Sequence, residues 1–345
     1  MSELAWEEAA GYSAPELDAT AGSIEAVQHR DGMLPWFAGG HADPWNHVEA
    51  AMALSATGRV AAAERAYEWL RATQRPDGAW HAYYGPDGDV EEPRLDTNVT
   101  AYVAAGVRHH HLVTGDRSFL EQMWPVVEAA VCFALRSQRT SGEVPWAVDP
   151  DGTPGGFALL AASSSLCTSV RAAVSVAHAL GIERPRWERS LALLERAVAT
   201  RPWSFAPKGE FAMDWYYPVL AGAVRGHAAR ARLDRGWRTF VLEGSGVLCR
   251  SDRRWVTTAE TAECAIACAR AGRVGAAAAL LCWTRAHRGD DGSYVTGLVH
   301  PGRDEFPRGE RTTYSAAAVV LAAEVLAGRP ATVEVLAPTR ADPAS

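Results

Sequence analysis

Apolar residues recur with the 3.6-residue period of an α-helix along most of the chain, whereas the alternation typical of strands is nearly absent. Many of these segments are rich in alanine, which has the highest helix propensity. The pattern therefore predicts an all-α fold. The expected helices span residues 15–29, 44–57, 59–73, 97–114, 117–138, 165–180, 185–199, 215–229, 230–241, 258–271, 273–287 and 312–327.

The expected helices fall into two alternating series. One series is charged and amphipathic, as in AAAERAYEWLRATQ (61–74), and the other is small and apolar with a polar start, as in DTNVTAYVAAGVRHHH (96–111). Repeats at intervals of 43 to 68 residues indicate an array of helical hairpins. The apolar segments start at residues 43, 96, 164, 214, 257 and 311.

Six apolar and six charged helices are typical of a closed barrel. We therefore expect one domain over residues 1–345, an (α/α)6 barrel of six inner and six outer helices, with residues 331–345 as a flexible tail. Short Gly-containing turns join each inner helix to its outer partner, and longer loops lead back to the next inner helix. Such long loops usually carry function.

In such a barrel all inner helices point the same way, so their N-termini meet at one mouth. Carboxylates and flat aromatic side chains gather there, a mixture suited to sugars, because aromatic faces stack on sugar rings and carboxylates bind hydroxyl pairs. Two carboxylates across a cleft can hydrolyse a glycosidic bond. The candidates are Asp43, Trp45, His47, Trp80, Asp96, Asn98, Asp214, Trp215, Tyr216, Trp255, Glu260, Glu263, Asp291, Tyr294, Arg311 and Tyr314.

A purely structural interpretation competes with this one. Asp43 before Pro44 fits an ordinary helix N-cap, and Thr257 with Glu260 fits a capping box. His47 fits a core histidine as well as a substrate ligand. Caps do not explain the neighbouring aromatic residues, and a capping acid can also be catalytic. The run of histidines at residues 109–111 ends a helix, where we expect it at the surface.

Composition and charge remove several other functions. The net charge is −7 and basic residues form no patch, so no nucleic-acid partner is expected. The N-terminus has no apolar h-region, and no apolar run approaches the roughly 20 residues that span a bilayer, so we expect a cytoplasmic protein without a membrane partner. The six cysteines fit small residues in a reducing compartment, with no set for a metal and no need for a cofactor.

The stretch QRPDGAW (74–80) resembles the repeat of squalene-hopene cyclases and protein prenyltransferases. The chain has neither the Asp/Cys/His zinc set of the prenyltransferases nor the D-x-D-D acid motif of the cyclases. The Pro-Asp-Gly sequence itself predicts a tight turn after an outer helix. The motif therefore indicates the barrel architecture and not a lipid substrate.

The segments DPWNH (43–47), MDWYYPVLAGAVRG (213–226), WVTTAETAE (255–263) and the D-x-x-F-L-x-x-x-W-P stretch at 116–125 are similar to glucoamylase-like six-hairpin glycosidases. The chain also resembles actinobacterial proteins often labelled prenyltransferases, a group that includes methylmannose polysaccharide hydrolases. The resemblance covers roughly residues 20–330. It implies an inverting α-glycosidase that cuts within an oligosaccharide, at α-1,4-mannosidic bonds, with Asp43 and Glu260 as the catalytic acids.

The expected activity is therefore hydrolysis of an α-linked oligo- or polysaccharide, without metal or organic cofactor. Two rival functions remain at this stage, an isoprenoid-processing enzyme and a non-catalytic glycan-binding barrel. The sequence leaves open which of Asp43 and Glu260 donates the proton, the identity and methylation of the sugar, endo or exo attack, and the oligomeric state.

Overall fold

The computed structural model describes residues 11–338. The expected helices are present, with most ends within a few residues of the predicted ones, although α10 ends nine residues earlier, at Leu220 and not at residue 229. The helices are α2 (Ala14–Glu25), α3 (Pro44–Ala56), α4 (Val60–Thr73), α5 (Thr97–Ala101), α6 (Val103–Thr114), α7 (Arg117–Arg136), α8 (Leu160–Ala179), α9 (Pro185–Thr200), α10 (Ala212–Leu220), α11 (Gly226–Phe240), α12 (Thr258–Arg270), α13 (Val274–Trp283), α14 (Thr313–Leu326) and α15 (Pro330–Leu336).

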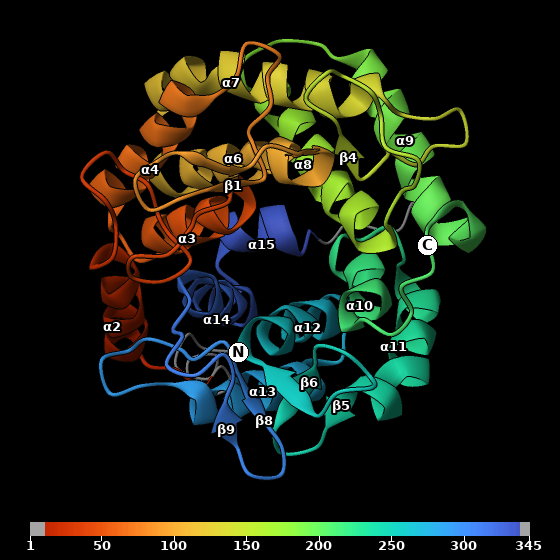
Figure 1. The fold of residues 1–345 in the computed structure, drawn as a ribbon. Coiled ribbons are helices and arrows are strands. Elements are labelled where there is room, and N and C mark those ends of the chain that lie inside the picture. Colours follow the sequence, from red (N-terminus) through yellow and green to blue (C-terminus); the bar gives the residue numbers. More distant parts are fainter. Residues whose placement is uncertain (1–10, 339–345) are drawn as a thin grey trace.

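Six helices form a closed ring (Figure 1). Around it, α3 contacts α6, α6 contacts α8, and the contacts continue through α10, α12 and α14 back to α3. An outer helix packs on each member: α4, α7, α9, α11, α13 and, from the N-terminal end of the chain, α2. The architecture is therefore a helical barrel with alternating inner and outer helices.

The two series differ in burial, as their sequences predict. All residues of inner α3 except the last are buried, whereas outer α9 buries only four of its 16 residues. Alanine is abundant on the inner helices because a ring of close helices leaves little room for larger side chains. The alternation of small apolar and amphipathic segments thus encodes the inside and outside of the barrel.

The Q-x-x-D-G sequence has a structural role. The Gln74 side chain donates hydrogen bonds to the carbonyl oxygens of Gly78 in its own turn (3.0 Å) and Val126 on α7 (3.0 Å). Gly78 has φ +93°, and a Cβ there would lie 2.4 Å from the Ala129 oxygen, so only glycine fits. Each such turn therefore fastens one outer helix to the next.

The same device recurs along the chain. Gln28 bonds Gly32 and Ala62 on α4, and Gln138 bonds Gly142 and Ser190 on α9. The prediction that QRPDGAW reports architecture and not substrate is consistent with this repeated use.

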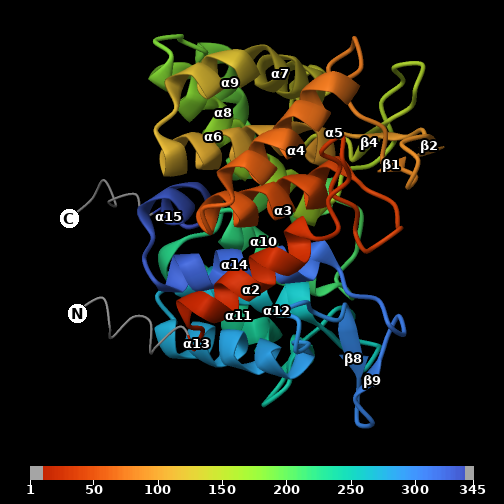
Figure 2. The same cartoon turned by 90° about the vertical axis from the view of Figure 1, so that its left-hand side faces the viewer.

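Short strands gather at one end of the barrel, beside the N-termini of the inner helices (Figure 2). The sequence did not predict these strands, because segments of two or three residues are too short to show an alternating pattern. The strands form three sheets. Two of these are two-stranded, β1-β2 and β3-β4, and the third has the order β5-β6-β7-β8-β9. The strands are β1 (Tyr83–Tyr84), β2 (Val90–Glu92), β3 (Leu95–Asp96), β4 (Ala147–Val148), β5 (Val241–Leu242), β6 (Gly246–Leu248), β7 (Trp255–Thr257), β8 (Gly297–Val299) and β9 (Asp304–Glu305).

The opposite end of the barrel is covered by α15 (Figure 2). The expectation of a flexible tail from residue 331 is wrong as far as residue 338, because Val335 and Leu336 are buried in the core. Residues 339–345 of that tail lie outside the described residues. Residues 1–10, at the N-terminus where no secretory signal is expected, also lie outside them.

The expectation that the histidines at 109–111 lie at the surface is wrong for two of the three. His109 and His110 are fully buried, and His109 Nε2 lies 3.0 Å from the Thr332 hydroxyl of α15. Burial lowers the pKa of His109 to about 3 and that of His110 to about 4, so both rings are neutral at physiological pH. His109 holds the closing helix to the inner ring, and His110 lies 2.8 Å from the Ser55 hydroxyl of α3.

Helices α7 and α8 are each 20 residues long and reach a mean hydropathy of 1.2, long and apolar enough to cross a membrane by length and composition; α14 with α15 forms a bent pair that also qualifies. The expectation that no apolar run approaches this length is wrong by that criterion. In the structure 78% of the α8 window is buried, so its apolar surface serves the barrel interior. The absence of a membrane partner stays a prediction.

Candidate active site

A pocket of about 230 Å³ opens at the mouth of the barrel. It is formed by the start of α3 and the loop before it, by the N-terminal parts of α5, α8 and α10, and by the loop around Trp146. Two of its residues, Asp43 and Asp96, are carboxylates that the sequence analysis placed there. Its walls are formed by Trp36, Asp43, Trp45, Asn46, Ala82, Tyr83, Asp96, Asn98, Val99, Trp146, Leu159, Ala161, Ala162, Ser165, Met213 and Tyr217.

Asp43 is both the N-cap of α3 and a wall of this pocket. Its Oδ1 accepts hydrogen bonds from the backbone N–H groups of Trp45 (2.8 Å) and Asn46 (3.0 Å). Its Oδ2 accepts from the Trp36 indole and from the Asn46 side-chain amide (2.5 Å). Burial raises the pKa of Asp43, and these N–H donors oppose the rise. The capping interpretation is therefore correct, and the catalytic role of this residue stays a prediction.

Glu260 does not act as a cap. The Thr257 side chain makes no hydrogen bond to the backbone at the start of α12, so the expected capping box is not formed. Glu260 is half-buried, and it lies one turn closer to the mouth than Glu263 on the same face of α12. Since Glu263 points into the barrel, Glu260 faces the interior just below the mouth.

The ring places one helix between the two acids. Helix α12 contacts α14, and α14 contacts α3, so the helices of Glu260 and Asp43 are next but one in the ring. Two side chains that reach inward from such helices leave a gap between their carboxyl groups, because neighbouring axes are about 8–10 Å apart.

Glu263 lies at the centre of a tyrosine cluster. It accepts hydrogen bonds from the hydroxyls of Tyr217 (2.7 Å), Tyr314 (2.8 Å) and Tyr216, which come from α10 and α14. Burial raises the pKa of Glu263 to about 8; the hydroxyls of Tyr216 and Tyr217 oppose the rise, and the neighbouring carboxylate of Glu49 reinforces it. This cluster closes the floor of the barrel below the mouth.

Glu49 on α3 completes the buried cluster. It accepts a hydrogen bond from the Tyr102 hydroxyl, and burial raises the pKa of Glu49 to about 7. Sequence reasoning missed Glu49 and Tyr102. A signal was available, because Glu49 is the only acidic residue in the buried segment PWNHVEAAMALSA. A lone acid on an all-buried helix requires a partner, and the tyrosine supplies it.

These raised values give a testable dependence of stability on pH. A carboxyl whose pKa is higher in the folded state stabilises the fold at low pH, and this contribution is lost as the pH rises through the folded value. For Glu263 the window runs from its ordinary pKa of 4.5 to about 8. We expect the unfolding free energy, measured by denaturation with urea, to decline across this window.

Glu263→Gln should make that decline shallower, since glutamine accepts hydrogen bonds and does not ionise. Glu183→Gln, a change at an exposed acid, is the matched control and should leave the slope unchanged. An unchanged slope in Glu263→Gln would show that Glu263 does not titrate in this range.

The other two acids of the mouth have structural partners. Asp96 pairs with Arg94 (2.7 Å) and makes no capping hydrogen bond to its own helix, α5. Burial raises the pKa of Asp96, and Arg94 opposes the rise. Asp214 Oδ1 accepts from the Ala161 N–H at the start of α8 (3.1 Å), and burial raises the pKa of Asp214 to about 6.

Aromatic rings line the pocket as expected, although partly from other residues. Trp45 packs edge-on against Tyr314 (5.3 Å between ring centres), and Trp36 packs edge-on against Tyr83 (6.3 Å). The Arg94 guanidinium lies over the Trp146 ring, 4.6 Å from its centre. Trp146, Asn46 and Met213 were not predicted as site residues. Trp146 lies in a loop and starts no apolar helix, while Asn46 and Met213 are next to the predicted residues Trp45 and Asp214.

Several predicted site residues lie in the core, and those predictions are wrong. His47 is fully buried, with Nδ1 accepting from the Leu34 N–H (3.0 Å) and Nε2 2.9 Å from the Ala66 oxygen. Trp80 is buried and donates to the Leu70 carbonyl (3.0 Å). Tyr294 is fully buried beside the N-terminal helix.

Trp215 and Tyr216 also face away from the pocket. Trp215 stacks on Phe240 of α11 (5.4 Å, 16°) and donates to the Arg232 carbonyl (2.9 Å), so it joins an inner helix to its outer partner. Tyr216 is buried against Glu263 and contributes to the site only through that residue. Asn98 lines the pocket as predicted.

Seven further predicted residues are not among the walls of this pocket: Asp214, Glu260, Glu263 and Tyr314, together with Asp291, Arg311 and Trp255. Asp291 and Arg311 line a separate cavity beside α2. Trp255 belongs to β7, where its indole donates to the Phe306 carbonyl (3.0 Å). Within residues 11–338, no three His, Cys, Asp or Glu side chains lie together as ligands for a metal ion.

The barrel resembles several solved structures. A wild-type glycosidase superposes with a TM-score of 0.72 and 15% identity, covering 91% of this chain and 98% of that structure. The GH63 mannosylglycerate hydrolase of Thermus thermophilus gives 0.68 and 14% over 88% and 99%. A D-mannose isomerase gives 0.67 and 10% over 90% and 96%, so the fold by itself does not select the reaction.

The fold is thus a helical barrel of the glycosidase type, with carboxylates and aromatic rings at its mouth. No family model matches the chain. Over 316 residues it is 46% identical to the MMP endo-(1,4)-3-O-methyl-alpha-D-mannosidase of Mycolicibacterium hassiacum, covering 89% of this chain and 85% of that protein. The chain belongs to the family of this enzyme and is a glycoside hydrolase. The isoprenoid-processing alternative is not favoured.

Proposed function

We propose that the protein is an inverting endo-α-mannosidase, which cleaves internal α-1,4 bonds of a 3-O-methylated mannan on an (α/α)6 barrel. The similarity to the Mycolicibacterium enzyme over most of both chains carries the substrate class. The ring of six inner helices, each with an outer partner, supports the barrel class. Asp43 and Glu260 supply the two carboxylates.

Asp43 donates the proton to the leaving glycosidic oxygen in this proposal. Burial raises the pKa of Asp43, which favours the protonated form that an acid requires. Four N–H donors surround its carboxylate, so protonation must displace one of them. The Asn46 amide can turn over to present its oxygen, Oδ1, which is buried without a hydrogen-bond partner among the described residues. Asn46 can thus bond both forms of Asp43.

Glu260 is the base. It is half-buried, so water reaches it, and its helix, α12, is next but one to that of Asp43 in the ring, with α14 between them. Glu260 removes a proton from a water molecule as that water attacks the anomeric carbon from the face opposite the leaving group. The C–O bond to the leaving sugar breaks, and the oxygen takes its proton from Asp43.

Product analysis tests the proposal. Wild-type protein is incubated with a panel of 3-O-methylated and unmethylated α-1,4-mannans and with α-1,4-glucans, and the products are separated by size. Release of mid-sized fragments from the methylated mannan supports it. Single sugars as the first products would indicate exo attack, and binding without cleavage would indicate a glycan-binding barrel.

A further inference from the structure

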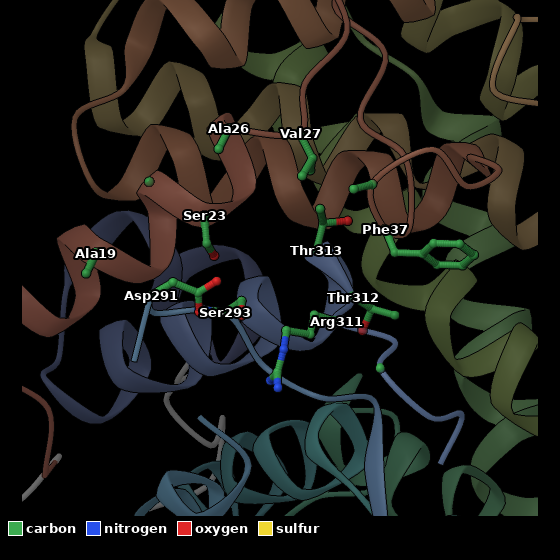
Figure 3. A pocket seen from close by; sticks show the side chains of 13 residues that line it. Ala19, Ser23, Ala26, Val27, Phe37, Asp291, Ser293, Arg311, Thr312 and Thr313 are labelled. Carbon is green, nitrogen blue, oxygen red and sulfur yellow. Dashed lines mark hydrogen bonds between the residues drawn. The ribbon is translucent and has the colours of Figure 1, made fainter. Parts of the chain in front are cut away.

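A second and larger pocket, of about 600 Å³, lies beside the active site between α2 and the loop that leads into α14 (Figure 3). Ligand pockets commonly measure about 300–1,000 Å³, so this cavity is large enough for a sugar unit, whereas the catalytic pocket of about 230 Å³ is small for an oligosaccharide. A chain cut internally must extend beyond the catalytic pocket on at least one side.

The two sides of this pocket differ in chemistry. Helix α2 and the two residues after it supply a floor of small apolar surface from Ala19, Gly22, Ala26 and Val27. The ring of Phe37 forms one end, and it is half-exposed. Such surface suits the C–H face of a sugar and its methyl ether, which cannot hydrogen-bond.

The opposite side is polar. Asp291 Oδ1 accepts from the Ser293 N–H (3.0 Å) and hydroxyl (2.6 Å), while Oδ2 accepts no hydrogen bond within residues 11–338. Arg311 bonds Glu305 through Nη2 (3.2 Å) and leaves Nη1 without a bond to any described residue. Figure 3 shows Asp291 and Ser23 of α2 pointing toward one another across the cavity. These groups can accept from and donate to sugar hydroxyls.

One wall separates this pocket from the active site. Trp36 lines the catalytic pocket and bonds Asp43, while the next residue, Phe37, lines the second pocket. The wall is fastened to the start of α14, because the Thr313 N–H donates to the Trp36 carbonyl (2.7 Å) and its hydroxyl to the Pro35 carbonyl (2.7 Å). A chain in the catalytic pocket therefore needs only to cross the rim of this wall to reach the second pocket.

We propose that the second pocket is a distal subsite, which binds methylated sugar units of the same chain whose bond is cut at Asp43 and Glu260. The inference rests on the proposed function and deepens it, since it locates the surface that makes internal attack favourable over attack at a chain end.

The test fills the pocket without touching the catalytic residues. Ala26→Trp places an indole on the exposed floor position at the C-cap of α2. Ala14→Trp makes the same exposed substitution at the first residue of α2, in a different groove, beside Leu17 and Ala327. Kinetics are measured on short and long 3-O-methylated α-1,4-mannan oligosaccharides. Binding of the long ones to Asp43→Asn, alone and combined with Ala26→Trp, is followed by calorimetric titration.

For Ala26→Trp we expect KM on long oligosaccharides and Kd in the inactive background to rise about tenfold or more, the equivalent of about 1.4 kcal/mol. The value of kcat and all constants on short oligosaccharides should match wild type, as should every constant of Ala14→Trp. Equal KM and Kd for Ala26→Trp and wild type on long chains would overturn the subsite while leaving the activity established. If wild type cleaves none of these mannans, the proposed function fails, and the subsite fails with it.

Discussion

Asp43→Asn and Glu260→Gln should each lower kcat by about 10²–10⁴-fold, the contribution of one general acid or base. Asparagine is as good an N-cap as aspartate, so the Asn side chain can still accept from the backbone N–H groups of Trp45 and Asn46. Glu260 caps no helix end in the structure. Both variants should therefore fold, and circular dichroism and thermal melting check this.

The matched control is Asp116→Asn, which changes a second N-cap aspartate, at the start of α7, away from the mouth. It should keep wild-type kcat and KM. If Asp43→Asn retains wild-type kcat and melts at a much lower temperature, Asp43 is a cap alone. If Glu260→Gln retains wild-type kcat, another carboxylate is the base, and Asp96 in the wall of the pocket is the first candidate.

The second large effect concerns stability and follows from a corrected prediction. Trp215→Ala should lower the unfolding free energy by about 3–5 kcal/mol, the cost of truncating a buried tryptophan. The side chain is buried, stacks on Phe240 and donates to the Arg232 carbonyl. Its loss opens a cavity between α10 and α11 and leaves that carbonyl without its partner.

Trp203→Ala is the control, because Trp203 is 78% exposed and its removal opens no cavity. Urea denaturation of both variants gives the comparison, with an expected loss below about 0.5 kcal/mol for the surface change. A loss of less than about 1 kcal/mol in Trp215→Ala, combined with a raised KM, would return Trp215 to the substrate site.

The helices and the ring could be predicted because the signal is long and repeated. Each inner segment is small and apolar over more than ten residues, and each outer one is amphipathic, so errors at single positions cancel. The strands of two or three residues at the mouth have no such redundancy. Helix α15 was missed for a related reason: PATVEVL is seven residues long, and its burial depends on contacts with α6 and α14 from distant parts of the chain.

The location of the site could also be predicted, because the N-termini of parallel helices must meet. Which way each side chain points could not. Asp214, Trp215 and Tyr216 are consecutive at the start of α10, yet Asp214 reaches α8, Trp215 packs outward on α11 and Tyr216 faces the Glu263 cluster. A helix turns about 100° per residue, so neighbours at one helix start face different elements. The partners on those elements decide which residue reaches the substrate.

In the proposed mechanism, Asp43 and Glu260 act across a gap that admits a water molecule. Their helices are separated by α14 in the ring. A distance of about 6.5–9.5 Å between carboxyl groups is typical of inverting glycosidases, whereas retaining enzymes need about 5–5.5 Å.

The most direct measurement is proton NMR of the first products released from an α-1,4-mannan, recorded before mutarotation. We expect the new reducing end to be β at first and to turn into the α/β mixture later. An initial α-anomer would contradict it, because retention requires a nucleophile closer to the bond than either Asp43 or Glu260.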